Sequence, residues 1–294
     1  MSSRKLRDKV ASKLMLLVTL FSCLIVFAIV LTLVYQSIPL LTIQPITKTL
    51  FSTSWNPLDG QFGFAPFIAG TLWVTIVSMC LSIPPSLLTS IYLAEYASNK
   101  LRQIVKPLID LLAGIPSVIF GLVGILVIVP LVRNDIAPFF GVYTTGYNIL
   151  TASIVLAIMV FPVMISISVE VMKGVPQAFR NASMGMGATK WQTVKKVVIP
   201  TSLPGLTAAI ILGFGRAFGE TIAVLMLVGN VAKLPSSIFS PAYPLPALIA
   251  NNFGDMMSVP SYDSALMFAA VILLVIVIVF SILSQIVLAK LKKV

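Results

Sequence analysis

The chain has 294 residues, of which 58% are hydrophobic and only 10% are charged. A soluble protein of that length needs a charged surface, so the composition excludes an ordinary water-soluble domain and indicates lipid as the main solvent. There is no histidine, which removes the commonest general base and metal ligand, and we expect no catalytic residue, metal site or cofactor. Cys23 and Cys80 lie in apolar runs and are predicted to be buried thiols.

Six long apolar stretches follow one another along the chain, each near or above the roughly 20 residues that a helix needs to span a bilayer core. They are Lys13–Leu40, Pro66–Leu93, Leu108–Val132, Leu150–Val171, Leu203–Val228 and Ala265–Leu288. Only helices and closed barrels satisfy their backbone polar groups in lipid, and barrel strands are shorter and alternate in polarity. The sequence therefore predicts an all-α polytopic membrane protein with six transmembrane helices.

The first stretch follows a basic tail, as a signal peptide would. Its apolar run is too long for a signal peptide, and no small-residue cleavage site follows it. We expect it to be retained as a helix. Residues 1–61 would then form a cytoplasmic tail, the first transmembrane helix and an external loop, and residues 62–294 the core of the protein.

The basic residues alternate between the two sides of the predicted spans. With the N-terminus inside, 16 of the 20 Lys and Arg residues fall in cytoplasmic segments, whereas only Lys48, Arg133 and Lys233 are external. The cytoplasmic set is Arg4, Lys5, Arg7, Lys9, Lys13, Lys100, Arg102, Lys106, Lys173, Arg180, Lys190, Lys195, Lys196, Lys290, Lys292 and Lys293. Cytoplasmic loops of membrane proteins carry such an excess. The pattern predicts an N-in, C-in orientation, and it accounts for the net charge of +11 without nucleic acid as a partner.

The cytoplasmic segment Val175–Pro204 reads as two short helices outside the membrane. We expect one helix at Gln177–Met184, a break at Gly185 and Gly187, and a second helix at Ala188–Val198 that ends before Pro200. From the residues alone, this segment could simply be an amphipathic hairpin that holds two membrane helices together.

The same segment resembles the conserved cytoplasmic loop of binding-protein-dependent ABC importer permeases. In that pattern, Asn181, Ala182 and Ser183 occupy the Glu-Ala-Ala triplet, Gly187 occupies the glycine position, and Val197, Ile199 and Pro200 close the motif. Asn181 departs from the usual glutamate, so any ionic contact made by that acid is not carried over. The resemblance implies a type I ABC importer permease fold in which residues 175–200 form a coupling loop that docks on an ATPase.

The resemblance also implies partners. They are a second related permease subunit, two ATP-binding subunits, an external phosphate-binding protein and the surrounding membrane lipid. The chain has no Gly-x-x-x-x-Gly-Lys-Ser/Thr loop to cradle nucleotide phosphates. We therefore expect it not to be an enzyme, with ATP hydrolysis in separate subunits.

Three further segments resemble the phosphate branch of these permeases: Phe62–Leu72, Ala113–Val118 and Gly215–Val224. The Phe62–Pro66 start, Val129–Arg133 and Val228–Asn230 resemble the C-type subunit more closely than its A-type paralogue. The resemblance implies a phosphate importer of the plasma or inner membrane. Sulfate or molybdate permeases, and a stand-alone secondary transporter, remain alternatives.

Within the fifth stretch, Arg216 and Glu220 are four residues apart, near the middle of the predicted span. A spacing of four puts both side chains on one face of a helix, so we expect Arg216 and Glu220 to lie together. Two interpretations stay open: an ion pair that fixes helix packing, or a polar lining of a translocation path. Arginine suits an oxyanion because its planar donor fork matches tetrahedral oxygens. Thr221 could add a hydroxyl to that lining.

The external segment Gly229–Ser264 differs from the rest of the chain. It contains five prolines and a short helix-like piece around Leu245–Met257. It is either a plain connection or a docking surface for an external partner, because long loops without regular structure are often functional.

Overall fold

The structure, a computed structural model, describes residues 3–254 and 261–291. In those residues, six helices are long and apolar enough to cross a membrane, which confirms the predicted number: Arg7–Ile43, Ala65–Tyr96, Ser117–Phe139, Ile149–Lys173, Lys190–Gly219 and Tyr262–Val287. Lys292, Lys293 and the last part of the helix-like piece, 255–257, lie outside the described residues. The orientation across the membrane stays a prediction.

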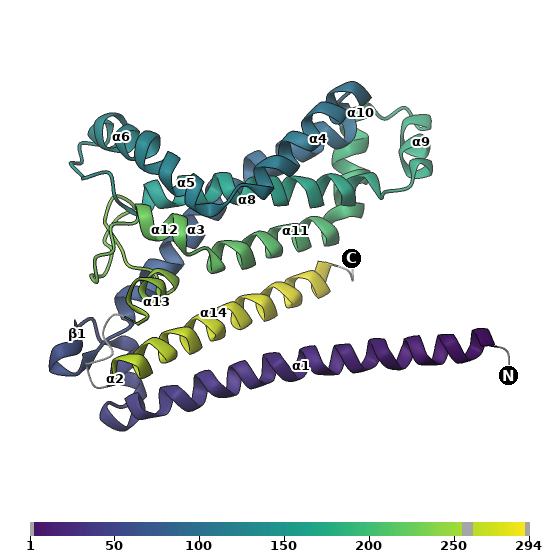
Figure 1. Ribbon diagram of the computed structural model, residues 1–294. Coiled ribbons are helices and arrows are strands. Elements are labelled where there is room, and N and C mark those ends of the chain that lie inside the picture. The colour runs from purple at the N-terminus through teal and green to yellow at the C-terminus, as the bar shows by residue number, and fades with distance from the viewer. Residues whose placement is uncertain (1–2, 255–260, 292–294) are drawn as a thin grey trace.

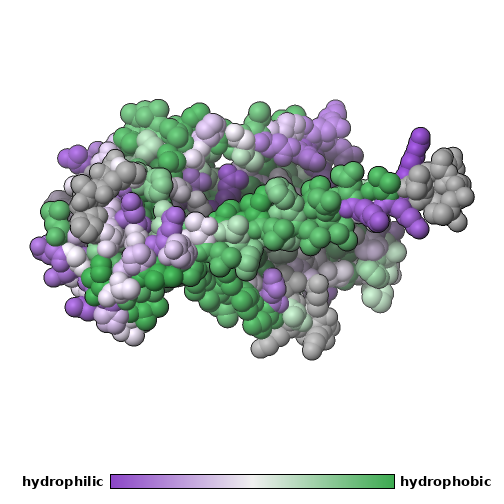
Figure 2. All heavy atoms as spheres, turned by 60° about the horizontal axis from the view of Figure 1, so that its bottom comes forward, coloured by the Kyte–Doolittle hydropathy of each residue, from purple (hydrophilic) through white to green (hydrophobic). Residues whose placement is uncertain are grey.

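The first and last spans lie side by side at one edge of the molecule (Figure 1). They are α1 (Ser3–Ile43) and α14 (Tyr262–Leu291). The apolar window of α1 is not buried at all against the rest of the chain. Figure 2 shows hydrophobic side chains over the middle of this face and hydrophilic ones toward its ends. A helix that is apolar all round and uncovered by protein is one that faces lipid.

Both cysteines are exposed rather than buried, so that expectation was wrong. Cys23 lies in the apolar part of α1 that is not buried against the rest of the described chain, and Cys80 is an exposed residue of the second span. An apolar neighbourhood in the sequence predicts contact with an apolar solvent. In a membrane protein that solvent is lipid as often as protein.

A small hairpin interrupts the all-α fold between the first two spans. After α2 (Ile46–Phe51), β1 (Trp55–Asn56) pairs antiparallel with β2 (Gln61–Phe62). The Trp55 ring lies edge-on to Phe62, Phe64 and Phe67, at centroid distances of 5.6, 5.3 and 4.7 Å. These aromatic contacts join the hairpin to the start of α3 (Ala65–Ile91). The predicted domain boundary after residue 61 falls inside this hairpin.

The centre of the fold is the packing of α3 against α8 (Ile149–Lys173). On α3, the side chains that face the interior are mostly small and hydroxylic, and all are buried: Thr71, Thr75, Ser78, Ser82, Ser86 and Ser90. Small residues let two membrane helices approach closely. The Ser153 hydroxyl of α8 donates to the Val74 carbonyl of α3 at 3.2 Å, which is a direct bond between the two helices.

The third predicted span, Leu108–Val132, was wrong in its bounds. The chain forms the amphipathic helix α4 (Asn99–Gly114), breaks at Ile115–Pro116, and starts a new helical arm at Ser117 that ends at Phe139. Ile115 has extended backbone angles (φ −67°, ψ 131°), which proline imposes on the residue before it. Pro116 therefore ends one helix rather than kinking a longer one, and α4 and α5 diverge from the break (Figure 1).

The new arm consists of α5 (Ser117–Val123), α6 (Val129–Leu131) and α7 (Ala137–Phe139), joined by π-helical turns at Gly124–Ile128 and Val132–Ile136. Gly121 lies close to Met226 of the fifth segment, where an added Cβ would come within 2.5 Å of the Met226 sulfur. The arm thus packs on α12 (Ile222–Leu227) through a glycine contact.

The fifth predicted span, Leu203–Val228, was also wrong at both ends. A continuous helix runs from α10 (Lys190–Thr193) through a π-helical turn into α11 (Ile199–Gly219). The wider turn at Val194–Val198 precedes Pro200 and accommodates its missing N–H, so the helix does not end there. At the other end, Glu220 is extended (ψ 121°) and stops the helix before α12. Glycine is costly in a helix, by about 1 kcal/mol, and Gly219 directly precedes this stop.

In the external segment, a short parallel bridge joins Gly229 and Ala242, and α13 (Leu245–Asn252) follows. The helix-like piece is therefore confirmed up to Asn252. Its first turn is buried, and the Leu245 N–H donates to the Thr71 hydroxyl of α3 at 2.9 Å. This part of the segment is therefore packed into the bundle.

Candidate functional site

One end of the molecule gathers most of the described basic side chains. Here called the basic end, it comprises the C-terminal end of the second span, the start of α4, the end of α8, the hairpin of α9 (Gln177–Gly185) and α10 with the π-helical turn Val194–Val198, and the N-terminal part of α1. Figure 1 shows the N-terminal part of α1 and the C-terminal part of α14 pointing the same way, while β1, α2 and α13 lie toward the other end. The predicted coupling loop is thus on the same side as the N-terminal part of α1 and the C-terminal part of α14.

The α9–α10 hairpin is fixed to the membrane helices by a buried arginine. Arg180 on α9 is only 9% exposed. Its Nη2 lies 2.7 Å from the Glu95 Oε1, and its Nε donates to the Glu95 Oε2 at 3.4 Å. Glu95 belongs to the π-helical turn Tyr92–Tyr96 at the end of the second span. This is the one ion pair found between described residues.

The same guanidinium also binds the end of α8. Nη2 donates to the Met172 carbonyl at 2.8 Å, and Nη1 donates to the Val175 carbonyl. The last carbonyls of a helix lack intrahelical partners and carry partial negative charge. A planar, multidentate donor can therefore satisfy them together with the carboxylate. Arg180 consequently joins α9, α3 and α8 at a single point.

The turn of the hairpin is closed by local contacts. Gly187 has a left-handed backbone (φ +86°), a conformation that side chains disfavour. Thr189 and Gln192 form a reciprocal capping box at the start of α10. The buried hydroxyls of Ser183 and Thr193 lie 2.9 Å apart and connect the two helices. The hairpin is therefore an internally bonded unit rather than a loose loop.

Three of the five predicted coupling residues lie on the exposed surface of this unit. Asn181, Ala182 and Gly187 are exposed, Ser183 is buried, and Pro200 is exposed but lies beyond the hairpin. Large apolar side chains accompany them: Phe179, Met184, Met186 and Trp191 are 51%, 43%, 86% and 52% exposed. Pro200 lies in the continuous helix, one turn past the hairpin. The surface is apolar and projects from the basic end, as a docking face for another protein would.

The second group of predicted residues lies where the fifth span breaks. Arg216 is in the last turn of α11, Glu220 is the extended residue that ends it, and Thr221 precedes α12. Because Glu220 is no longer helical, the expected alignment of Arg216 and Glu220 on one helical face was wrong. No described carboxylate lies within ion-pairing distance of Arg216. The Thr221 hydroxyl donates to the Gly219 carbonyl at 3.2 Å.

The surroundings of Arg216 are open. The side chains of Arg216, Glu220 and Thr221 are half-buried, and the two neighbouring glycines, Gly215 and Gly219, have no atoms within 4 Å of an added Cβ. Gly213 differs, because a Cβ there would lie 3.0 Å from the Met164 sulfur of α8. One side of α11 therefore packs against α8, and the side that carries Gly215 and Gly219 is uncovered within this chain.

Sequence reasoning missed Glu95 and underrated Arg180. Arg180 was counted only among the cytoplasmic basic residues, and no role was predicted for Glu95. The two residues are 85 positions apart, so no helical or strand periodicity could pair them. The available signal was an acid inside the otherwise uncharged segment Ile91–Ala97.

The sequence profile of the family described as "Binding-protein-dependent transport system inner membrane component" matches residues 86–293 of this chain. The probable ABC transporter permease protein YqgH of Bacillus subtilis is 40% identical over 214 residues, which cover 72% of this chain and 67% of that protein. The phosphate transport system permease protein PstC of Haemophilus influenzae is 35% identical over 258 residues, covering 83% and 81%.

A solved structure shares the fold. The crystal structure of a bacterial alginate ABC transporter in complex with an alginate pentasaccharide-bound periplasmic protein contains a chain that superposes with a TM-score of 0.64. The match covers 96% of the present chain and 94% of that chain at 14% sequence identity. This agreement concerns the arrangement of the helices alone.

Proposed function

The chain belongs to the family of binding-protein-dependent transport system inner membrane components, and from this premise we propose that it is the permease subunit of an ATP-driven phosphate importer. It is a multi-pass protein of the plasma or inner membrane. The relatives that carry phosphate transport names span most of the chain, and they support phosphate over sulfate or molybdate.

The substrate proposal rests on the surroundings of the Arg216 side chain. It is half-buried in a span of low charge, with open glycine positions beside it and no ion-pairing partner among the described residues. A charged side chain at membrane depth is costly, by about 2.5–3.5 kcal/mol on insertion scales, and commonly marks a substrate or ion path. A tetrahedral oxyanion would supply the missing negative charge. Glu220 and Thr221, at the adjacent helix break, would complete the lining of the translocation path.

The α9–α10 hairpin would transmit the movement of the ATP-binding subunits to the membrane helices. We place the basic end in the cytoplasm, where two ATP-binding subunits would dock on the exposed face around Asn181, Ala182 and Gly187. Because Arg180 bonds to α3 and α8 as well, displacement of the hairpin would move the ends of those helices with it. The path then opens alternately to each side, while ATP is hydrolysed in the partner subunits.

The remaining partners complete the importer. A second, related permease subunit would cover the uncovered face of α11 and share the path. An external phosphate-binding protein would deliver the anion at the end that carries α13. The chain itself makes no covalent change in the substrate and uses neither nucleic acid nor a cofactor.

The test is uptake of labelled phosphate by vesicles that contain the chain, its partner permease and the ATPase subunits, with the binding protein outside. We expect uptake that requires ATP and that excess sulfate or molybdate does not reduce. Uptake without ATP, or equal competition by sulfate, would contradict the proposal. An Arg216→Ala complex in the same vesicles reports whether this guanidinium lies on the path.

A further inference from the structure

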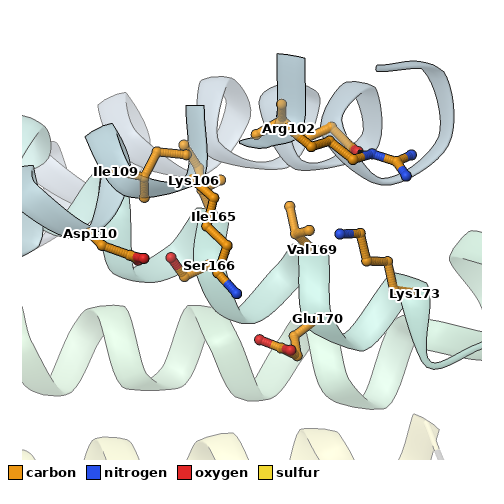
Figure 3. Close-up of a pocket in the computed structure, with 10 residues that line it drawn as sticks. Arg102, Lys106, Ile109, Asp110, Ile165, Ser166, Val169, Glu170 and Lys173 are labelled. Atoms are coloured by element: carbon orange, nitrogen blue, oxygen red, sulfur yellow. Dashed lines mark hydrogen bonds between the residues drawn. The ribbon is translucent and has the colours of Figure 1, made fainter. Parts of the chain in front are cut away.

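A pocket of about 320 Å³ lies between α4 and α8 at the basic end, away from Arg216 and from the apolar docking face of the hairpin. Figure 3 shows the side chains that surround it, drawn from α4 above and α8 below. Its lining is Leu93, Arg102, Lys106, Ile109, Asp110, Ile165, Ser166, Val169, Glu170 and Lys173. Five of these side chains are charged, and none of the five takes part in the proposed coupling between ATP hydrolysis and transport.

The wall of the pocket is apolar. Leu93, Ile109 and Ile165 are 7%, 9% and 1% exposed and belong to one hydrophobic cluster that packs α4 on α8. On the outer side of α4, Ile104, Leu108 and Leu111 are exposed. The transmembrane stretch of α8 ends at Lys173. The pocket therefore lies where an apolar, lipid-facing surface meets the charged end of the molecule.

The cations around the pocket are not neutralised by ion pairs. Among the described residues, neither Lys106 nor Lys173 lies within ion-pairing distance of a carboxylate. The guanidinium of Arg102 donates to the Leu93 and Ala94 carbonyls at 2.6 and 2.5 Å, so it is held in place by neutral acceptors. Figure 3 shows the Lys173 amine and the Arg102 guanidinium toward one side of the pocket.

Two acids share the same pocket. The Asp110 carboxylate lies on the side of the pocket opposite Arg102, and the Glu170 carboxylate lies on the α8 side (Figure 3). A free phosphate dianion would be attracted by the cations and repelled by these acids. A ligand with separate negative and positive groups satisfies both sets.

We propose that this pocket binds the headgroup of a membrane phospholipid that carries both a phosphate and a primary ammonium, such as phosphatidylethanolamine. The phosphate lies against Arg102, Lys106 and Lys173, and the ammonium donates to Asp110 and Glu170. The acyl chains extend from the pocket into the bilayer along the apolar stretch of α8, which ends at Lys173. This site is separate from the substrate path and does not depend on what the protein transports.

The experiment measures which lipid stays with the purified complex. The complex is stripped in detergent, incubated with phosphatidylethanolamine, phosphatidylcholine or phosphatidylglycerol, or with inorganic phosphate alone, and the bound species is read by native mass spectrometry. The wild type should retain phosphatidylethanolamine over the other two lipids and over phosphate. Equal retention of phosphatidylcholine, which cannot donate from its ammonium, or preferential binding of phosphatidylglycerol or phosphate overturns the proposal.

Two double variants address the two halves of the pocket. In K106Q/K173Q and in D110N/E170Q, affinity for phosphatidylethanolamine should fall by roughly tenfold or more, because hydrogen bonds to charged groups are lost in both. D110N/E170Q should also shift its preference toward phosphatidylglycerol, whereas K106Q/K173Q should not. A matched control is K13Q/K100Q, which removes the same charge from exposed positions of the same end outside the pocket. Unchanged retention in both pocket variants, or an equal loss in the control, would show that the pocket is not the binding site.

Discussion

The Arg180 guanidinium and the Glu95 carboxylate, 85 residues apart in the chain, meet at 2.7 Å at the point where the α9–α10 hairpin joins the membrane bundle. Both side chains are about nine-tenths buried. A buried pair of this kind can cost as much in desolvation as it gains in attraction, but breaking it leaves an uncompensated charge. Its effect here is geometric: it keeps the hairpin and α3 at a fixed relative position.

We predict that Glu95→Gln separates ATP hydrolysis from transport. Loss of the carboxylate leaves the Arg180 charge buried and unpaired, at a cost of about 3–5 kcal/mol. The hairpin should then move without α3. In the assembled importer, phosphate uptake should fall at least tenfold while ATPase activity persists. Asp8→Asn, an exposed acid on α1, is the control and should leave both unchanged. Parallel loss of uptake and ATPase activity would indicate failed assembly instead.

Arg180→Lys should lose phosphate uptake while ATPase activity persists, as predicted for Glu95→Gln. Lysine keeps the charge but lacks the planar fork that reaches the carboxylate and the Met172 and Val175 carbonyls together. The measurement is the ratio of phosphate moved to ATP hydrolysed. A wild-type ratio in the lysine variant would mean that charge alone, not the shared bonding, holds the hairpin.

At the turn of the hairpin, Gly187→Ala should weaken coupling although there is space for the methyl group. No atom lies within 4 Å of an added Cβ, but φ of +86° costs a side chain about 1–2 kcal/mol. Gly185→Ala is the matched control, because Gly185 is helical and equally uncrowded. Co-purification of the ATPase should decrease for the first variant and not for the second. A greater loss of ATPase co-purification in Gly185→Ala than in Gly187→Ala would show that the left-handed backbone of Gly187 is not required for docking.

For the path, Arg216→Ala should abolish phosphate uptake while the complex still assembles. Arg216→Lys should retain part of the activity, because a point charge still attracts the anion but binds it with fewer donors. Arg133→Ala, at an exposed position on the arm Ser117–Phe139, serves as the control. Assembly is checked by size-exclusion chromatography of the detergent-solubilised complex. Normal uptake by Arg216→Ala would remove this residue from the path.

The Ser183–Thr193 bond should contribute about 1 kcal/mol to the stability of the hairpin, as a typical buried hydrogen bond does. A double-mutant cycle of Ser183→Ala and Thr193→Val, measured by the thermal unfolding midpoint, isolates that term. Strictly additive effects of the two substitutions would mean that the two hydroxyls do not interact.

The sequence predicted the spans wherever apolar length alone decides the structure. It could not predict the breaks at Pro116 and Glu220, because apolar residues continue on both sides and hydropathy does not register a change in backbone direction. Pro116 lies inside the predicted span Leu108–Val132, yet the extended backbone of Ile115 ends the helix before it. The Arg216–Glu220 alignment failed for the same reason, since it assumed an unbroken helix.

The coupling residues were predicted from motif spacing, and the structure brings Asn181, Ala182, Ser183 and Gly187 together in one hairpin. What motif spacing could not supply was the anchor of that hairpin. The Arg180–Glu95 contact depends on tertiary packing of two segments far apart in the chain, and each residue alone looks like an ordinary charge at a membrane boundary.

For the apolar part of α1, the free energy of burial in the bilayer can be distinguished from the free energy of packing against the other helices. No residue of the α1 apolar window is buried against the rest of the described chain, so most of the gain from hiding that surface comes from the bilayer rather than from the bundle. Substitutions in the middle of α1 should therefore alter how firmly the chain is anchored in the membrane, while the heat resistance of the remaining helices in detergent stays the same. For this protein, a melting curve in detergent would not report defects in the first helix.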